Sequence, residues 1–524
     1  MKEKVVKKKS SKLLIIFVVT ALVVVGGSVS AFFLVVKSPK VQYFMAEADT
    51  FGQMGEIVED RYKNELKWIE VQQEKPVKTE FNLSGEWNDS SVDYDMQQVQ
   101  SIVNSVTLSM KQVNDPVKKE MEASFSGKLG SMDVNFGSVY ATSEKLLASF
   151  PFMDQLIRFD DKDYGKLMRE NNPEYQGNDN LGLSSLFENG FTMTEEHRTY
   201  VEKEYIQYLM KELPEEAFTS EKEEIVVFDK KVNTKKVKMD LSEIEVKKLM
   251  KNLFEKAKKD EKLKSILKEQ IAVSSIAGDA SNNDIATMME NYDDGLDEVI
   301  KGIDSISIPN GLQSTIWHQS NTIMKREFKM GIGQDNNQVS MLAIGGTQML
   351  DKEAQKWDYK VGVKESSGEN NDIRIKGKLT NKDGKANDSL TVSMNDNKFT
   401  YKGKEILKDK KRTFERSFGF TDGDMYPELI WKGSATHESD SIKANHEFTV
   451  NEESMGDNMF NLILKQQGKV VKKVDLPKEN SETVNIGQMS MVEIEAFIGE
   501  NVTPKFQEWI AGLMGDIQGE LDNL

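Results

Sequence analysis

The side chains best suited to chemistry are few and far apart in the sequence. None of the four histidines belongs to an HExxH motif or has tight metal-ligand spacing; they are His197, His318, His437 and His446. Paired strands would bring His437 and His446 together as zinc ligands, but ordinary surface histidines explain both more simply. The sequence therefore predicts no metal site.

Carboxylates are abundant but form no recognisable catalytic or calcium pattern. The acidic clusters lack the calcium-loop spacing with its closing glutamate; they are Asp160, Asp161 and Asp163, then Asp293, Asp294 and Asp297, then Asp422 and Asp424. Among 86 acids, close pairs arise by chance and do not define a glycosidase. There is no GxSxG, no SxxK followed by SxN and KTG, and no Walker or Rossmann pattern, and cysteine is absent. We predict a protein that is not an enzyme and has no cofactor.

The net charge of −17 is unevenly distributed. Residues 1–12 hold six lysines and one glutamate, a net of +5, which leaves −22 for the rest. An acidic bulk repels nucleic acid and anionic lipid headgroups. We therefore expect no nucleic-acid partner.

An uncharged run of 24 residues, Leu13 to Val36, is long enough to cross a bilayer as a helix. The lysines before it predict a cytoplasmic N-terminus, by the positive-inside rule. A cleaved signal peptide is the alternative, with Val29 and Ala31 at the small-residue positions. The apolar stretch beyond that cut favours an anchor. We predict a single-pass protein of the cell membrane whose bulk is extracytoplasmic.

Behind the anchor the hydrophobic period changes along the chain. Residues 37–75 have a helical stripe, which indicates a juxtamembrane helix docked on its own domain, with a coiled-coil stalk as the alternative. After Pro76 alternation with a period of two indicates antiparallel strands. Helical patterns follow, including a capping box at Ser242 and Glu245. Strands resume after the turn at Pro309–Gly311, and a helix from Thr503 to near Leu521 ends the chain.

These elements predict an α+β fold: an N-terminal transmembrane helix followed by two lobes of antiparallel sheet packed with helices. The expected divisions are a cytoplasmic tail at 1–12, the anchor at 13–36, the juxtamembrane helix at 37–75, a first lobe at 76–310 and a second lobe at 311–524. Whether the lobes arose by duplication is open.

Two early strands carry the candidate ligand-binding residues. Their apolar side chains alternate with polar ones, so they share one face of the sheet; they are Val106, Leu108, Met110, Met121, Ala123 and Phe125. Met and aromatic residues on a curved sheet would line an adaptable apolar cavity. The alternative is that helices seal this face and the residues are ordinary core.

Three stretches resemble uncharacterised membrane-anchored extracytoplasmic proteins of bacilli and their relatives. They are SPKVQYF (Ser38 to Phe44), IRFDDKDYGKLM (Ile157 to Met168) and KKDEKL (Lys258 to Leu263). The resemblance implies a Gram-positive cell envelope but assigns no activity or site residue. The order of elements is also similar to LolA-like envelope lipoprotein carriers, an analogy of architecture alone.

Together these observations predict a membrane-anchored envelope protein that binds a hydrophobic ligand or a partner protein at the outer face of the membrane. One alternative is a structural or interaction module without a ligand. The other is a cell-wall or lipid hydrolase with unidentified carboxylates. The expected partners are the membrane, through Leu13 to Val36, and a lipid or envelope protein, with a homodimer left open.

Overall fold

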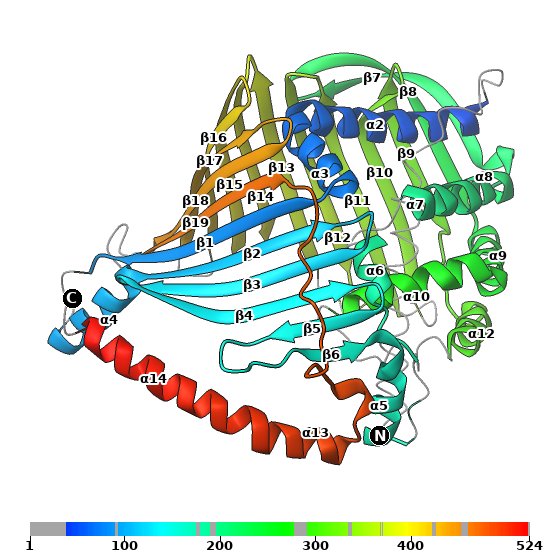
Figure 1. The fold of residues 1–524 in the computed structure, drawn as a ribbon. Helices are drawn as coiled ribbons and strands as arrows, with labels where there is room; N and C mark the ends of the chain where they lie inside the picture. Colours follow the sequence, from blue (N-terminus) through cyan, green and yellow to red (C-terminus); the bar gives the residue numbers. More distant parts are fainter. Residues whose placement is uncertain are drawn as a thin grey trace.

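The computed structural model describes residues 38–89, 93–173, 175, 179–188, 195–276, 291–333, 338–366, 368, 370–421, 426–451 and 460–521. Within these residues, twenty strands join in a single curved sheet (Figure 1). The predicted tail at 1–12 and the predicted anchor at 13–36 lie outside the described residues.

The strands are antiparallel neighbours in the order β7 to β19, then β1 to β6, and the sheet ends on β20, which pairs parallel with β6. Their bounds are β1 Val77–Trp87, β2 Val106–Asp115, β3 Glu120–Leu129, β4 Met132–Thr142, β5 Lys145–Ser149, β6 Ile157–Asp160, β7 Phe218–Val227, β8 Lys230–Leu241, β9 Leu312–Gln319, β10 Thr322–Gly333, β11 Val339–Leu350, β12 Ala354–Lys364, β13 Asn370–Lys382, β14 Lys385–Met394, β15 Asn397–Lys408, β16 Lys411–Thr421, β17 Glu428–His437, β18 Ser441–Asn451, β19 Phe460–Val470 and β20 Val484–Asn485.

Tight turns join most of the long strands. Asp383 and Gly384, with φ of 51° and 72°, link β13 to β14. Positive φ at both central residues suits the right-handed twist of a hairpin, and Asp-Gly adopts it readily. The turn residues of the sequence predict hairpins at Asn381–Gly384 and Asn395–Asn397, and both are confirmed.

Helices lie against the sheet and at its ends. Their bounds are α2 Pro39–Arg61, α3 Lys63–Glu74, α4 Tyr94–Ser105, α5 Tyr164–Asn171, α6 Leu183–Glu188, α7 Glu195–Val201, α8 Gln207–Glu212, α9 Glu243–Lys259, α10 Glu261–Ile276, α12 Tyr292–Ile303, α13 Met491–Phe497 and α14 Thr503–Leu521. The predicted capping box of Ser242 and Glu245 is present at the start of α9. The predicted juxtamembrane helix is interrupted at Tyr62, which separates α2 from α3.

The main hydrophobic core lies between β8–β11 and the helices α2, α8, α9 and α12. Tyr43 and Phe44 of α2 are buried in it, and the Tyr43 hydroxyl lies 2.6 Å from Ser314 Oγ on β9. The apolar stripe of α2 therefore docks on its own domain, with α2 and α3 inside the curve of the sheet (Figure 1).

The predicted fold of two α+β lobes is wrong. β8 pairs with β9 across the proposed boundary at Gly311, and β1 pairs with β19 over its whole length, so strands from both halves form one sheet. Alternation reveals that a segment is a strand, but it does not identify the strand's partners, because any amphipathic strand offers the same backbone donors and acceptors.

This shared sheet predicts that the second half cannot fold alone. A fragment of residues 311–524 leaves β9 without β8 and β19 without β1, and it lacks α2 and α9 from the core. We expect no cooperative thermal transition by circular dichroism. A fragment that unfolds cooperatively from a strand-rich state would contradict the single-sheet organisation.

Candidate functional site

The inner face of the sheet, against which α2 and α3 lie, is covered along only part of its strands. Trp68 of α3 is buried beside Val77 of β1 and Ile442 of β18. A Cβ at Gly468 of β19 would approach the Trp68 ring to 2.8 Å, so a glycine there lets the indole lie close to the backbone. Alpha3 is thereby held at one end of these strands.

A buried ionic network fixes the junction of α2 and α3 on the same face. Arg61 donates from Nη1 and Nη2 to the two carboxylate oxygens of Asp388 on β14, at 3.1 and 2.6 Å. Glu405 on β15 accepts from Arg61, from Arg412 at 2.8 Å and from Arg416 at 2.6 Å. Arg412 also bonds Glu65 of α3 at 2.6 Å. Three cations thus balance three carboxylates.

The charges in this network stabilise one another's ionised forms. Burial by itself would raise the pKa of Glu405, but the hydrogen bond from Arg416 and the charge of Arg61 outweigh it and leave the pKa lowered. Burial would lower the pKa of Arg61, but Asp388 and Glu405 raise it. The helix junction is therefore held by fully ionised side chains, which bond in specific directions.

Farther along the same strands, the inner face is apolar and open. We call this surface the apolar trough. Its large side chains are 36 to 49% exposed; they are Met394, Phe399, Phe420, Leu429, Val450, Phe460, Leu108, Phe125 and Phe136. Contiguous apolar exposure of this extent is unusual for a water-facing sheet and marks a site of interaction.

The trough is continuous because its side chains are paired across neighbouring strands. One row runs Leu390, Tyr401, Phe418, Leu429 and Val450, each residue facing the next in register. Directly opposed residues have Cβ atoms about 4.5–5.5 Å apart, so each side chain in the row lies next to its neighbour on the adjacent strand.

A second row crosses onto the first strands of the chain. It runs His446, Leu464, Leu83, Leu108 and Gly127 in register. The pairing of β1 with β19 therefore joins the apolar residues of the two sequence halves into one surface.

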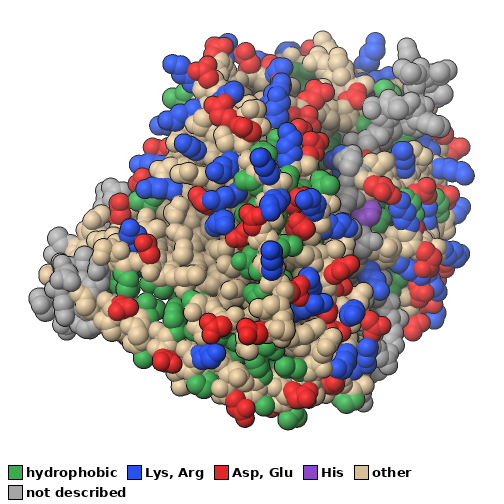
Figure 2. Space-filling model, in the orientation of Figure 1, with side chains coloured by type: hydrophobic (Ala, Val, Ile, Leu, Met, Phe, Trp, Pro, Cys, Tyr) green, Lys and Arg blue, Asp and Glu red, His purple; other side chains and the backbone are tan. Residues whose placement is uncertain are grey.

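Alpha14 lies opposite the trough at the β4 end. The Trp509 ring lies 6.5 Å from Phe136 of β4 and 5.9 Å from Phe152, and Phe506 lies 5.4 Å from Phe152. Ile510 and Met514 on the same helix stay 38 and 60% exposed. Figure 2 shows hydrophobic side chains gathered between α14 and the neighbouring strands.

The structure places the predicted ligand-binding residues together on this inner face. Met110 faces Phe125 in register, and Val106, Met121 and Ala123 have the same strand parity. Leu108 is 49% exposed and Phe125 is 42% exposed, so helices do not seal this face. Sequence reasoning missed the larger share of the trough on β14–β19, although aromatic residues at a spacing of two, such as Phe418 and Phe420, signal it.

Some of the other residues singled out in the sequence have hydrogen-bond partners, whereas the ring nitrogens of His318 and Nδ1 of His437 are buried without one in the described residues. His446 Nδ1 accepts from Trp431 Nε1 at 3.2 Å, while His437 lies near Arg412, and burial lowers the pKa of both histidines. Asp161 accepts from the backbone of Gly182 and Leu183. Within the described ranges no group of three or more His, Cys, Asp or Glu side chains is arranged to hold a metal ion. Asp422 and Asp424 lie outside the described residues.

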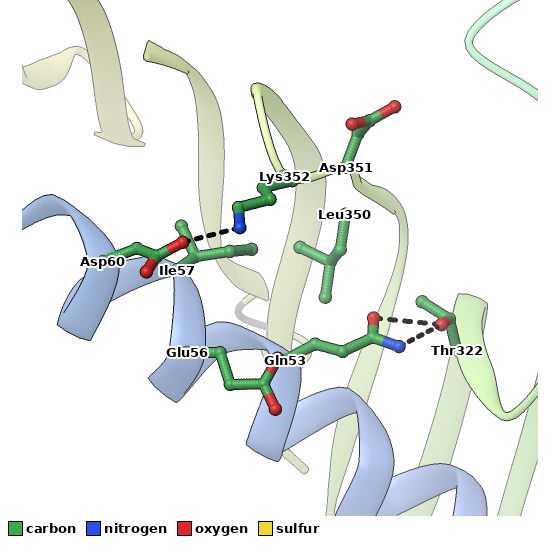
Figure 3. A pocket seen from close by; sticks show the side chains of 8 residues that line it. All are labelled: Gln53, Glu56, Ile57, Asp60, Thr322, Leu350, Asp351 and Lys352. Carbon is green, nitrogen blue, oxygen red and sulfur yellow. Dashed lines mark hydrogen bonds and ion pairs between the residues drawn. The ribbon is translucent and has the colours of Figure 1, made fainter. Parts of the chain in front are cut away.

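A polar cleft of about 390 Å³ lies between α2 and the β11–β12 turn (Figure 3). Four of its polar side chains pair with one another: Lys352 Nζ lies 2.8 Å from Asp60 Oδ2, and Gln53 bonds Thr322. The hydrogen bond from Lys352 lowers the pKa of Asp60. These paired side chains already bond one another and hold α2 against the β11–β12 turn. The apolar trough is therefore the stronger candidate site.

No family model matches the chain, and no curated protein matches it. Solved structures do align with it. OccAB2 of Acinetobacter baumannii aligns at 8% identity over 76% of this chain and 98% of its own, with a TM-score of 0.25. A BenF-like porin from Pseudomonas fluorescens aligns at 6% identity over 76% and 98%, with a TM-score of 0.23. The outer membrane protein opdK from Pseudomonas aeruginosa gives the same four values as that porin.

These comparisons contradict several predictions. The aligned structures include a porin and an outer membrane protein, whereas we predicted a single-pass, signal-anchored protein of a Gram-positive cell membrane that binds a hydrophobic ligand or partner. The prediction of a ligand or partner binder anchored by one helix, its location and the Gram-positive assignment are therefore withdrawn. TM-scores of 0.25 and below do not assign the chain to the porin fold.

Two further findings concern the membrane and the resemblance. In the part of the chain that the structure describes, no helix combines the length and the apolar character needed to span a bilayer. The resemblance to proteins of bacilli stays a prediction, since no family model supports or replaces it.

The ionic network predicts a large loss of stability on removing Arg61. Arg61→Ala leaves Asp388 and Glu405 buried without their main cation, so the free energy of unfolding should fall by about 3–5 kcal/mol. Urea denaturation followed by circular dichroism measures this. Arg374→Ala is the matched control, because Arg374 also bonds both oxygens of one aspartate but is 54% exposed. Its cost should be about 1 kcal/mol or less, and equal losses for the two variants would contradict the assigned role of Arg61.

The openness of the trough predicts unequal effects of the same truncation at two leucines. Leu108→Ala removes a half-exposed side chain and should cost about 1 kcal/mol or less. Leu241→Ala removes a side chain that is 1% exposed in the main core and should cost about 2–5 kcal/mol. Denaturation midpoints report both values, and a large loss at Leu108 would mean that the trough is a sealed core.

Proposed function

We propose that the chain is a non-enzymatic transport protein that moves amphiphiles along the apolar trough, with acyl chains against the sheet and headgroups in water. The observation that supports this most is the row of half-exposed apolar side chains running in register across strands from both ends of the chain. A surface of this kind lowers the free energy of an acyl chain by about 0.8 kcal/mol for each CH₂ it buries.

The length of the trough favours passage over storage of a single ligand. It crosses ten strands, from β14 through β19 and β1 to β4. At about 4.8 Å between strands, this is roughly 43 Å. One leaflet of a bilayer is about 15 Å of hydrocarbon, half of a 30 Å core. Several acyl chains therefore fit end to end, and one molecule has room to advance.

The composition of the trough favours acyl chains over a protein partner. Protein interfaces carry about one hydrogen bond for every 100–200 Å². Among the paired residues of the first row, Leu390, Tyr401, Phe418, Leu429 and Val450, only tyrosine has a hydrogen-bonding side chain. Acyl chains need no such partners. A protein partner or a second copy of the chain would leave the backbone and side-chain polar groups it brings unpaired against this surface.

This role differs from the enclosed carrier predicted from the sequence. Side chains around an enclosed ligand are shielded from water before it binds, whereas the large apolar side chains of the trough are 36 to 49% exposed. Molecules can therefore enter and leave at different points, as movement between two surfaces requires.

The proposal predicts that a charge in mid-trough stops transfer. Leu429→Glu places a carboxylate in the row between Phe418 and Val450, where an acyl chain would have to strip it of water. In an assay of fluorescent phospholipid exchange between neutral vesicles, we expect the protein-dependent rate to fall at least about tenfold, because burying an unpaired charge costs more than 1.4 kcal/mol.

Val226→Glu is the control for this experiment. Val226 is an exposed apolar residue on β7, away from the trough, so transfer should keep the wild-type rate. Both variants should retain the wild-type circular dichroism. Unchanged exchange in folded Leu429→Glu would reject the proposal, as would a stable dimer in which the trough is buried.

A further inference from the structure

The outer face of the same strands, opposite to α2 and α3, has a chemistry unlike that of the trough. Exposed lysines point outward from β13 to β19, and we call this surface the lysine face. Its members are Lys378, Lys385, Lys402, Lys404, Lys411, Lys443, Lys465 and Lys469. Each alternates along its strand with a residue of the inner face, as the pleat requires.

The lysines are arranged in two dimensions over the sheet. Ser389 of β14 pairs in register with both Lys378 of β13 and Lys402 of β15, so a hydroxyl separates two cations. Asn445 of β18 pairs with Lys465 of β19. From β13 to β19 the face is about 29 Å wide at 4.8 Å per strand, and β15 is about 40 Å long.

These lysines lack the ion pairs that about half of the other lysines in the described ranges make. In the described ranges, none of the eight lies within ion-pair distance of an acid, whereas Lys251, Lys256 and Lys262 on α9 and α10 each do. The outward acids of β16 to β18 are Glu415, Glu428 and Glu447. Glu415 faces Lys404 and lies 4.0 Å from Lys432. The lysine face therefore keeps a positive charge on a chain whose net charge is −17.

This distribution corrects the expectation that the acidic bulk repels anionic headgroups. That expectation averaged the charge over the whole chain. Screening limits each charge to about 8–10 Å at physiological salt, so a surface responds to the local patch and not to the total.

We propose that the lysine face docks the protein on a bilayer surface rich in anionic lipids. Each lysine near such a surface contributes favourable free energy, and several are needed for stable docking. The lysine ammonium is a point charge on a flexible side chain, whereas the planar guanidinium of arginine bonds one phosphate in a bidentate manner. Lysine therefore suits a diffuse layer of headgroups. A linear polyanion would contact a single row, whereas these cations cover a broad area.

The test compares binding of the full-length protein to two kinds of vesicle by sedimentation. One kind is pure phosphatidylcholine, and the other mixes phosphatidylcholine with phosphatidylglycerol. We expect stronger binding to the anionic vesicles, lost at high salt. The triple variant Lys378→Gln, Lys402→Gln, Lys404→Gln should weaken that binding at least about tenfold, since each lysine contributes about as much as a several-fold change in affinity.

A matched variant separates the patch from total charge. The control is the triple variant Lys251→Gln, Lys256→Gln, Lys262→Gln. It also removes three positive charges, but from α9 and α10, and it should bind anionic vesicles as the wild type does. Residues 1–12 and 13–36 are present in every variant, so their contribution cancels. Equal losses in both triple variants would overturn the proposal.

A second probe is soluble polyphosphate. If the triple variant of the lysine face loses polyphosphate binding but binds vesicles as the wild type does, the proposal is overturned in favour of a polymer ligand. Transfer between neutral vesicles measures the trough separately. Failure of docking therefore leaves the proposed transport function standing, and failure of transport leaves the docking result readable.

Discussion

Glu405 is the point on which the inner face of the sheet is organised. Its two oxygens bond arginines from α2 and β16, and Asp388 takes the remaining donors of Arg61. Burying these charges is costly, and it is offset only when each has its partners in place. The network therefore acts less as a source of stability than as a constraint on position. Alpha2 and α3 can lie on β14–β16 in one register alone, because a shift by one residue would bury unpaired charges.

That constraint explains why the rest of the face stays open. The helices end where the network and Trp68 hold them, over one end of the strands. Arg416 marks the change of chemistry: its guanidinium bonds Glu405 on one side and lies 4.6 Å from the Trp431 ring on the other. Beyond Trp431 the face is lined by aromatic and aliphatic side chains with no helix of this group above them. An apolar surface left open in this way is an outcome of where the helices are fixed.

Sequence reasoning predicted the local features whose causes are local. The strand alternation of Val106 to Met110, the turn at Asp383 and Gly384, and the capping box of Ser242 all depend on residues within a few positions. It did not predict the pairing of β1 with β19 or the ionic network, which joins Arg61 to residues more than 300 positions away. Such contacts depend on which strands become neighbours. Backbone hydrogen bonds are alike in every strand, so the sequence pattern carries little information about that choice. The prediction of two lobes was wrong because it used the hydrophobic periodicity of the strands without knowing how they pair.

One repeating pattern underlies both proposed surfaces. Along β15, Phe399, Tyr401, Gly403 and Glu405 point inward, while Lys402 and Lys404 point outward. The same alternation continues on β18, where Ala444 and Phe448 face inward and Lys443 faces outward. A strand that was merely solvated on one face would have acids and bases mixed there. On β14, β15 and β19 the charged outward positions are all lysine, although β16, β17 and β18 each also carry one outward glutamate, and the inward positions favour exposed apolar side chains. Water alone explains neither choice: unpaired like charges repel one another, and exposed apolar groups order water. Both become favourable when an anionic surface lies on one side of the sheet and hydrocarbon on the other.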